Sequence, residues 1–309
     1  MLTVNLPLSI SDTRNELEDL NMTLSRRGFL RTALGAAGLS GIKALWGSGE
    51  AHAASPGDSI QPEVMVEWLG HGSFLLESCG GKRILIDPWL STNPMCPGKY
   101  RKSGGFGKVD LILWTHGHVD HFMLSDAQSL VRDYHPKIIA PWELNFFIKS
   151  EIPEADCGTF TLGNKGSSAE IVGIQVTMVE AFHSAGAQLT GFEGTNRFVG
   201  EAVGYILEFE NGLRVYHAGD TSLMADMKLV IADFCKPDVA ILPIGGVFTM
   251  GPQEAAYACN MIKPRIVIPE HYGTFPVLEP DCARFREFVG RLAPEVALLE
   301  LSPGKAQRV

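Results

Sequence analysis

Three histidines and one aspartate lie within the seven residues 115–121, "THGHVDH", directly after the apolar run "VDLILW". A solvated turn does not require three imidazoles, and a protein core tolerates them only when their polarity is compensated. Imidazole nitrogen and carboxylate oxygen are common ligands of divalent metal ions. In the spacing HxHxDH, His116 and His118 can point at one ion while Asp120 and His121 turn toward a second. The segment therefore predicts a metal site.

Side chains of the same kinds follow other apolar runs. His183 follows "IQVTMVEAF", Asp220 follows "LRVYHAG", and His271 follows "RIVIPE". In folds that combine sheets with helices, the loops at strand ends converge on one crevice, so residues distant in sequence can meet there. The resulting five imidazoles and two carboxylates would be strongly unfavourable together without cations. We therefore expect two divalent metal ions, with zinc as the first choice and manganese or iron as alternatives.

Apolar periodicity predicts the elements that position these residues. The first part of the chain has strand-like runs at 64–69, 74–78, 83–87 and 109–115, then helical patterns near 125–132 and 141–149. Longer strand patterns follow at 171–182, 203–209 and 213–218. The last third alternates helical patterns (224–232, 252–262, 281–291) with strands (239–244, 265–270, 295–300). This order predicts an α/β fold with mixed sheet covered by helices, and a long surface loop at 96–108.

Composition narrows the class of protein. The chain has 309 residues, 45% of them hydrophobic and 20% charged, which is a globular composition. Its formal charge of −9 and the lack of a long Lys/Arg block argue against nucleic acid or anionic lipid as a main partner. The six cysteines show no CxxC spacing, so we expect free thiols rather than a metal finger or a disulfide framework.

Residues 25–54 have the features of a targeting segment. Arg26 and Arg27 precede an Ala/Gly/Leu-rich stretch that is short and interrupted by Lys43, and residues 51–53, "AHA", supply a small-x-small cleavage pattern. "SRRGFLR" closely resembles the twin-arginine export signal. An amphipathic first helix of the folded domain, or an uncleaved membrane anchor, would also account for the segment.

We accordingly predict an export signal over residues 1–54 and one catalytic domain over residues 55–309. The partner of the signal would be the twin-arginine export machinery, and the destination the bacterial periplasm, with no stable membrane span in the mature chain. Residues 1–54 contain five acidic and five basic side chains, so the predicted mature chain keeps the full charge of −9.

Residues from about 64 to 302 resemble the metallo-β-lactamase superfamily of metal-dependent hydrolases. The similarity is greatest to the branch related to ascorbate-6-phosphate lactonase and, more distantly, to the N-acyl phosphatidylethanolamine phospholipase D. The stretches that carry it are "WLGHGSFLLE", "ILIDPWL", "THGHVDH", "AFHSA", "YHAGDTSLMADM", "LPIGGVFTMGPQEAA" and "IPEHYGTFP". The resemblance implies an αββα sandwich, in which two mixed sheets are flanked by helices. It makes a β-lactam a weaker choice of substrate, because this branch is not built around antibiotics.

The resemblance also implies roles for individual residues. The ligands of one metal would be His116, His118 and His183, those of the other Asp120, His121 and His271, and Asp220 would bridge both ions. A bridging water would be the nucleophile, and Asp120 would also orient it and shuttle its proton. Val119, in the variable position of HxHxDH where relatives often have a small residue, and the loops around 96–108 and after His183 are idiosyncratic, so the substrate is not implied.

Four further features could contribute to the site. His71 in "GHGSF" could donate a hydrogen bond to substrate or to metal-bound water, which would make it a third catalytic candidate, or serve as a structural turn residue. His217 is expected to pack or to support a ligand, with a role as a metal ligand itself as the alternative. The basic run 99–102, "KYRK", could attract an anionic leaving group such as phosphate or be a solvated loop. Tyr272 and Thr274 could line the pocket.

The expected function is hydrolysis of an ester, lactone, amide or phosphodiester in a small-molecule substrate by a dinuclear metal centre. The same ligands would also permit a metal-binding protein without turnover. A redox enzyme that uses iron in the same site is a third option, although no flavin or thiol partner motif is evident. The sequence does not indicate the oligomeric state.

Overall fold

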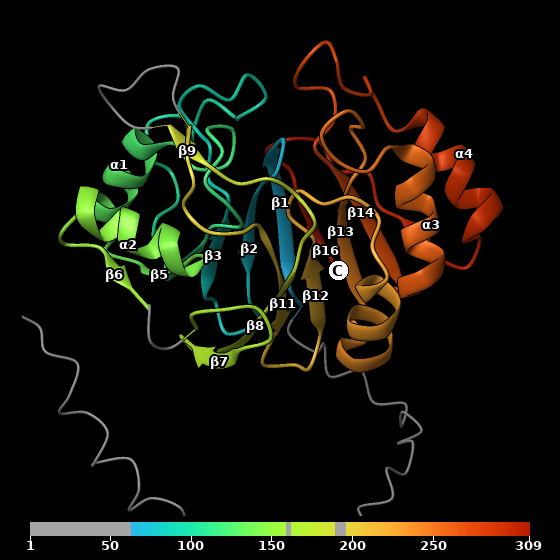
Figure 1. Ribbon diagram of the computed structural model, residues 1–309, viewed down its shortest axis with the longest axis horizontal. Helices are drawn as coiled ribbons and strands as arrows, with labels where there is room; N and C mark the ends of the chain where they lie inside the picture. The colour runs from blue at the N-terminus through green and yellow to red at the C-terminus, as the bar shows by residue number, and fades with distance from the viewer. Residues whose placement is uncertain (1–62, 159–161, 189–195) are drawn as a thin grey trace, which may run out of the picture. The chain divides into compact units, whose positions relative to one another are not determined.

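The computed structural model describes residues 63–158, 162–188 and 196–309, and these form two mixed sheets flanked by helices (Figure 1). The predicted twin-arginine signal over residues 1–54 lies outside the described residues and stays a prediction. Within the described part, no helix is long and apolar enough to cross a membrane.

The first sheet has seven strands in the order β16-β1-β2-β3-β4-β5-β6. It is antiparallel from β16 to β3 and parallel from β3 to β6. Its strands are β1 (Met65–Gly70), β2 (Ser73–Glu77), β3 (Arg83–Ile86), β4 (Leu111–Leu113), β5 (Lys137–Ile139), β6 (Asp156–Cys157) and β16 (Ala306–Arg308). Helices α1 (Leu124–Tyr134) and α2 (Trp142–Glu151) cover its outer face.

The second sheet also has seven strands, in the order β15-β14-β13-β12-β11-β8-β7. Its parallel half is β12 (Arg214–His217), β13 (Val239–Pro243), β14 (Ile266–Glu270) and β15 (Ala297–Leu298). Its antiparallel half is β7 (Ser168–Ile171), β8 (Ile174–Glu180) and β11 (Val203–Glu208). The helices associated with this sheet are α3 (Pro252–Ile262), α4 (Ala283–Leu292) and the π-helix η1 (Met227–Cys235). The strands β9 (Ala187–Gln188) and β10 (Asn196–Arg197) form a separate antiparallel pair.

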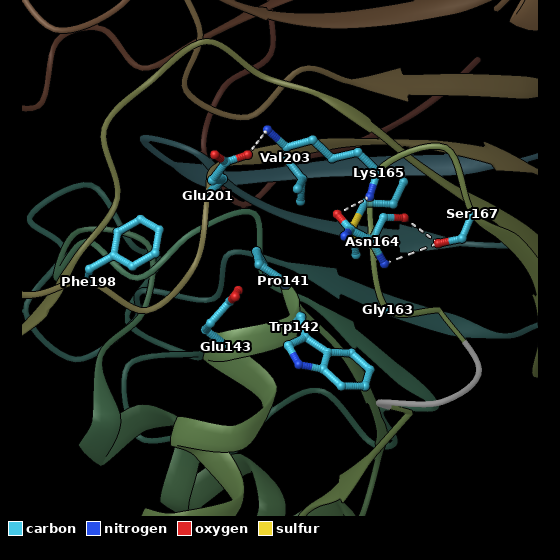
Figure 2. A pocket seen from close by; sticks show the side chains of 11 residues that line it. Pro141, Trp142, Glu143, Gly163, Asn164, Lys165, Ser167, Phe198, Glu201 and Val203 are labelled. Atoms are coloured by element: carbon cyan, nitrogen blue, oxygen red, sulfur yellow. Dashed lines mark hydrogen bonds and ion pairs between the residues drawn. The ribbon is translucent and has the colours of Figure 1, made fainter. Parts of the chain in front are cut away.

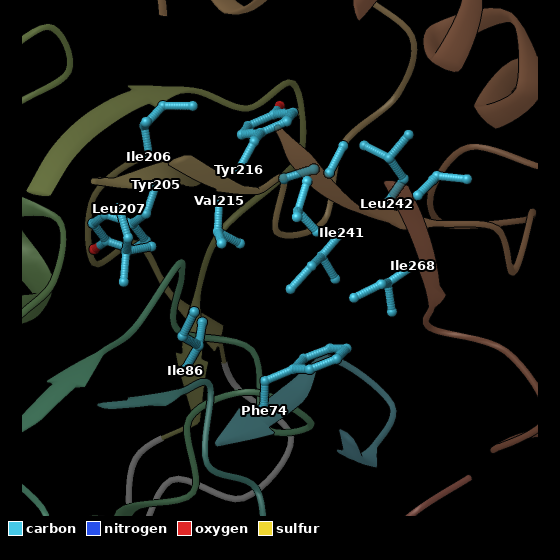
Figure 3. Close-up of a cluster of buried hydrophobic side chains, with 14 of the residues drawn as sticks. Phe74, Ile86, Tyr205, Ile206, Leu207, Val215, Tyr216, Ile241, Leu242 and Ile268 are labelled. Carbon is cyan, nitrogen blue, oxygen red and sulfur yellow. The ribbon is translucent and has the colours of Figure 1, made fainter. Parts of the chain in front are cut away.

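The core between the sheets follows from side-chain alternation along the strands. Phe74 and Ile86 of the first sheet point toward Val215, Ile241 and Ile268 of the second, as Figure 3 shows, and all five side chains are fully buried. Fully burying a side chain of this size stabilises the fold by about 1.5–3 kcal/mol. This layer therefore holds the two sheets together.

The intervening residues of the first sheet face its helices instead. Leu75, Leu85 and Ile112 belong to a second buried cluster together with Leu130 of α1 and Leu144 of α2. On the far side of the second sheet, α3 and α4 contribute buried side chains to the main cluster. The order of layers is thus helix, sheet, sheet, helix, which confirms the predicted αββα sandwich (Figure 1).

The prediction of one strand over 171–182 is wrong, because the segment forms part of a tight hairpin. β7 ends at Ile171, β8 begins at Ile174, and Ile171 pairs directly with Ile174. The two connecting residues, Val172 and Gly173, have φ of 51° and 88°, the conformation of a type I′ turn. A β-branched residue disfavours positive φ, so a valine at position 172 favours a continuous strand in the sequence and gives no indication of the turn.

The helix predicted over 252–262 is confirmed as α3, with Pro252 in its first turn, where a missing N–H costs nothing. The helix predicted over 224–232 begins later and is the π-helix η1. The short edge strand β16 was not predicted, since its three residues are all exposed and carry no apolar pattern.

Candidate metal centre

Three histidines from two loops form a first group of candidate ligands. His116 Nε2 lies 2.9 Å from His118 Nδ1, and His183 Nε2 lies 3.3 Å from the same atom. In a neutral imidazole a proton on one nitrogen of such a pair can be shared as a hydrogen bond. A divalent cation can take the place of that proton when all three nitrogens turn their lone pairs inward. The sequence-predicted set for the first metal is therefore brought together.

A second group contains Asp120, His121 and His271, together with His71. One ligand atom from each of these four side chains lies within 4.8 Å of the others. The first three are the residues that the resemblance implies for the second metal. His71 was expected in the site as a hydrogen-bond donor, and its membership of this group comes from the fold.

Asp220 lies between the two groups and contacts both. Its Oδ2 atom is 3.5 Å from His183 Nε2 and 4.0 Å from His116 Nε2 on one side, and 3.1 Å from His271 Nε2 on the other. Its Oδ1 atom is 3.3 Å from His121 Nε2. A carboxylate in this position has the geometry to bridge two ions.

The groups meet because both sheets deliver strand ends to one edge of the sandwich. His116 follows β4 of the first sheet, whereas His183, Asp220 and His271 follow β8, β12 and β14 of the second. The close approach requires small residues. A Cβ atom on Gly72 would lie 2.5 Å from His121 Cε1, and one on Gly245 would lie 2.0 Å from the carbonyl oxygen of His271.

Asp87 supports the cluster from beneath, and sequence reasoning did not assign it a role. This fully buried carboxylate accepts hydrogen bonds from the backbone N–H of Thr115 (2.7 Å), from Thr115 Oγ1 (2.5 Å) and from His121 Nδ1 (2.8 Å). Its position directly after β3, with φ of 45°, directs it to the same edge. An aspartate at a strand end in "ILIDPWL" was the available signal.

These contacts determine which nitrogen of each imidazole faces the cluster. Thr115 donates its hydroxyl proton to Asp87, so its oxygen accepts from His116 Nδ1 at 2.9 Å. His121 likewise uses Nδ1 to donate to Asp87. In both residues Nε2 then faces the cluster and can bind a metal ion once it carries no proton.

Replacing Asp87 with asparagine is expected to reduce metal affinity about 10–100-fold, the usual cost of losing a partner that orients a metal-ligating histidine. The amide keeps the size of the side chain but cannot accept from three donors at carboxylate strength. Metal titration followed by fluorescence or calorimetry measures the change. Asp126→Asn is the matched control, because Asp126 is also buried and accepts from two backbone N–H groups, those of Leu90 and Ser91. Equal losses in both variants would mean a general effect on folding.

His71 is fully buried, and both of its ring nitrogens have partners. Nε2 lies 3.2 Å from Asp120 Oδ2, and Nδ1 lies 3.1 Å from Thr274 Oγ1. Burial, reinforced by the positive charge of His271, lowers the pKa of His71 to about 4, so the ring is neutral at pH 7. A neutral ring has one proton, which Nε2 donates to the carboxylate while Nδ1 accepts from the threonine.

The histidines of the site differ in the direction in which their pKa values are shifted. Burial lowers the pKa of His116, His118 and His183, with further lowering by neighbouring imidazoles. Burial alone would also lower the pKa of His121 and His271, but the Asp220 carboxylate outweighs it and raises both. The first three rings are therefore neutral and ready to bind a cation.

Three buried atoms of the cluster have no hydrogen-bond partner among the described residues: His121 Nε2, Asp220 Oδ1 and His271 Nδ1. The first two form an ion pair at 3.3 Å. Unsatisfied buried polar atoms are costly unless an ion or another ligand completes them. The imidazole and carboxylate donors, together with these orphaned atoms, fit divalent metal ions.

His217 lies outside the cluster, as expected for a supporting residue. It is fully buried, accepts a hydrogen bond from the backbone N–H of Gly219 at 3.1 Å, and faces Glu270 Oε2 at 3.3 Å. Gly219 precedes Asp220 and Glu270 precedes His271, so this pair joins the two loops that carry those residues. Glu270 was not singled out from the sequence.

The segment 96–108, predicted as a surface loop, is partly buried in the structure. It has no helix or strand, but the rings of Tyr100 and Phe106 are buried and stack with centroids 4.4 Å apart. Lys99 pairs with Glu67 at 3.0 Å, and Arg101 donates to carbonyl oxygens of its own loop. These contacts engage Lys99 and Arg101, two of the three basic side chains of "KYRK".

The chain is similar to known metal-dependent hydrolases. The β-lactamase superfamily domain matches residues 65–271. The chain is 38% identical over 248 residues to a UPF0173 metal-dependent hydrolase of Roseiflexus sp. (strain RS-1), and the match covers 80% of this chain and 98% of the relative. It is 41% identical over 252 residues to a UPF0173 metal-dependent hydrolase of Cupriavidus necator, and this match covers 78% of the chain and 85% of the relative. Among solved structures, Igni18, a metallo hydrolase of Ignicoccus hospitalis, superposes with a TM-score of 0.67 at 30% identity over 80% of this chain and 98% of its own. These matches confirm the fold family predicted from the sequence.

Proposed function

Because the chain belongs to the β-lactamase superfamily and to its UPF0173 metal-dependent hydrolases, we propose that it uses two divalent metal ions to hydrolyse an ester, lactone, amide or phosphodiester bond. The observation that carries the dinuclear mechanism is the position of Asp220, whose two carboxylate oxygens lie within 3.5 Å of His121, His183 and His271. One carboxylate in contact with both ligand groups is the arrangement that two ions require.

When bound, two such ions supply a water molecule of lowered pKa and polarise the oxygen of the scissile group. The residues of the chain hold them in place, with His116, His118 and His183 around one position and Asp120, His121 and His271 around the other. Asp120 is also the base that orients the attacking water and receives its proton. His71 would hold Asp120 in its orientation through the 3.2 Å hydrogen bond between His71 Nε2 and Asp120 Oδ2.

Elemental analysis and a substrate screen test this proposal. Purified protein should contain close to two equivalents of metal, with zinc expected ahead of manganese and iron. It should also hydrolyse at least one of p-nitrophenyl acetate, a simple lactone and bis-p-nitrophenyl phosphate. Bound metal without turnover of any of them would favour the metal-binding alternative, and absence of metal would overturn the site.

Metal affinity is expected to rise with pH. In the metal-free protein the pKa values of His121 and His271 are raised, so these rings carry protons near neutral pH, and ligation must displace them. Loading with zinc in weak buffer at neutral pH should therefore release protons, and affinity should fall as pH falls through those raised values. Affinity that stays constant from about pH 6 to pH 9 would contradict this linkage.

We propose in addition that the protein is exported through the twin-arginine machinery to the periplasm. The support is the sequence "SRRGFLR" followed by the weakly apolar stretch and "AHA". Replacing Arg26 and Arg27 together with lysine should retain the full-length protein in the cytoplasm, because the pair is the element that this machinery reads. Fractionation of cells measures it. Unchanged export of the double variant would argue against this route.

A further inference from the structure

Two adjoining cavities lead away from the metal centre. The first, about 520 Å³, is lined by His183, and the second, about 800 Å³, reaches Trp142 at the beginning of α2. Lys165, Phe198 and Glu201 line both, so the two cavities form one continuous groove. Figure 2 shows the outer part, where Trp142 and Glu143 lie opposite the pair formed by Lys165 and Glu201. This surface is called the His183–Trp142 groove below.

The groove exposes large apolar side chains beside the catalytic cluster. Phe182, which precedes His183, is 71% exposed, Phe198 is 69% exposed, and Trp142 is 36% exposed. Apolar residues scattered singly are ordinary, but several along one concave surface indicate a binding site. Met178 and other aliphatic side chains complete the lining.

The charged residues of the groove leave little for an anion to bind. Lys165 Nζ lies 2.5 Å from Glu180 Oε1 and 2.8 Å from Glu201 Oε2. Burial alone would lower the pKa of Lys165, but these two carboxylates outweigh it and raise the pKa. Arg197, next to Phe198, also has an interaction partner. Glu143 adds a third carboxylate to the lining, so a negatively charged group would be repelled here.

We propose that the His183–Trp142 groove binds the part of the substrate that extends from the scissile bond, and that this arm is an apolar acyl or aryl group without a negative charge. The inference rests on the proposed hydrolase function for the position of the scissile bond, because His183 belongs both to the metal centre and to the groove.

Matched esters test the chemical class of the arm. The kcat/KM of the metal-loaded protein should be higher for p-nitrophenyl octanoate than for p-nitrophenyl acetate. It should be lowest for the p-nitrophenyl half-ester of suberic acid, which has the same chain length and a terminal carboxylate. Trp142→Ala and Phe198→Ala should each reduce the octanoate-to-acetate ratio roughly two- to tenfold, as expected for loss of one aromatic contact. Phe234→Ala is the control, since Phe234 is 80% exposed in η1 and does not line the groove.

Reversing one charge of the groove gives a second test of the same inference. Glu143→Lys should raise the activity toward the suberate half-ester relative to the octanoate, because it replaces a lining carboxylate with a cation. Glu151→Lys, in the last turn of the same helix, should not. A preference of the unaltered protein for the suberate half-ester, or equal kcat/KM values for octanoate and acetate, would overturn the inference.

Binding of the neutral fluorescent probe N-phenyl-1-naphthylamine separates this inference from the proposed function. The probe should bind the full chain, and Trp142→Ala and Phe198→Ala should each weaken binding roughly two- to tenfold, while Phe234→Ala leaves it unchanged. If the probe binds in this way but neither the esters nor the lactone and phosphodiester of the screen are cleaved, the groove inference is supported and the hydrolase proposal fails. If esters are cleaved but neither Trp142→Ala nor Phe198→Ala alters probe binding, the groove inference fails and the hydrolase proposal is supported.

Discussion

The Asp220→Ala variant is expected to lose both metal ions and nearly all hydrolytic activity. The Asp220 carboxylate is the group that contacts histidines of both ligand groups, at 3.1–4.0 Å. Its removal also leaves the positive charges of protonated His121 and His271 without their main partner. Metal catalysis contributes several kcal/mol, and at about 1.4 kcal/mol per tenfold the fall in kcat/KM should be on the order of 10³-fold or more.

Metal content by elemental analysis and activity on the best substrate of the screen measure this result. Asp220→Asn keeps the size of the side chain, so it should show the same metal loss with less risk to folding. Asp226→Ala is the control, since Asp226 is the carboxylate immediately before η1 and belongs to no candidate ligand group in the described residues. Retention of one full equivalent of metal in both Asp220 variants would show that this carboxylate does not bridge.

The His118→Ala variant is expected to lose one ion and keep the other. His118 Nδ1 contacts His116 and His183 but belongs to no group with Asp120 or His271. The metal content should therefore fall by about half, with the remaining ion at the second position. Loss of one of two cooperating ions should lower kcat/KM roughly 10²–10⁴-fold.

Anomalous scattering from crystals of the variant would show which position is still filled. His135→Asn serves as the control, because His135 is exposed at the end of α1, and asparagine tolerates its positive φ of 48°. Equal depletion of both positions in His118→Ala would mean that the two ligand groups are not independent, and would remove the basis for assigning this histidine to one ion.

Most of the architecture could be predicted because local periodicity and tertiary packing agree over most of the chain. The helix over 252–262 and the parallel strands around it have apolar residues at the spacings that the sandwich buries. The prediction failed where local preference and structure conflict. Val172 takes a conformation that its side chain disfavours, and the pairing of β7 with β8 and the packing of its side chain against the main buried cluster hold it there.

The candidate ligands were predictable for a different reason. Histidine and aspartate directly after apolar strands are costly unless they converge on something that compensates them, so their types and positions carry the signal. Of the supporting residues, Asp87 carries the same signal, because it directly follows the apolar strand β3, whereas Thr115 is an ordinary residue for a strand end. The roles of both toward His116 and His121 come from hydrogen bonds across two loops.

The sequence alone determined the alternation of strands and helices and the set of metal-type side chains, because these depend on residue types and on spacings along the chain. The family and the αββα order of layers followed from the resemblance of its motifs to a known superfamily. Tertiary structure decided which of those side chains share a position, that Asp220 lies between the two groups, and that His71 is held behind Asp120. It also decided that aromatic residues near 142, 182 and 198 line one groove. Such contacts depend on how the two sheets pack against each other. No local pattern in the chain specifies the distances between loops that this packing brings together.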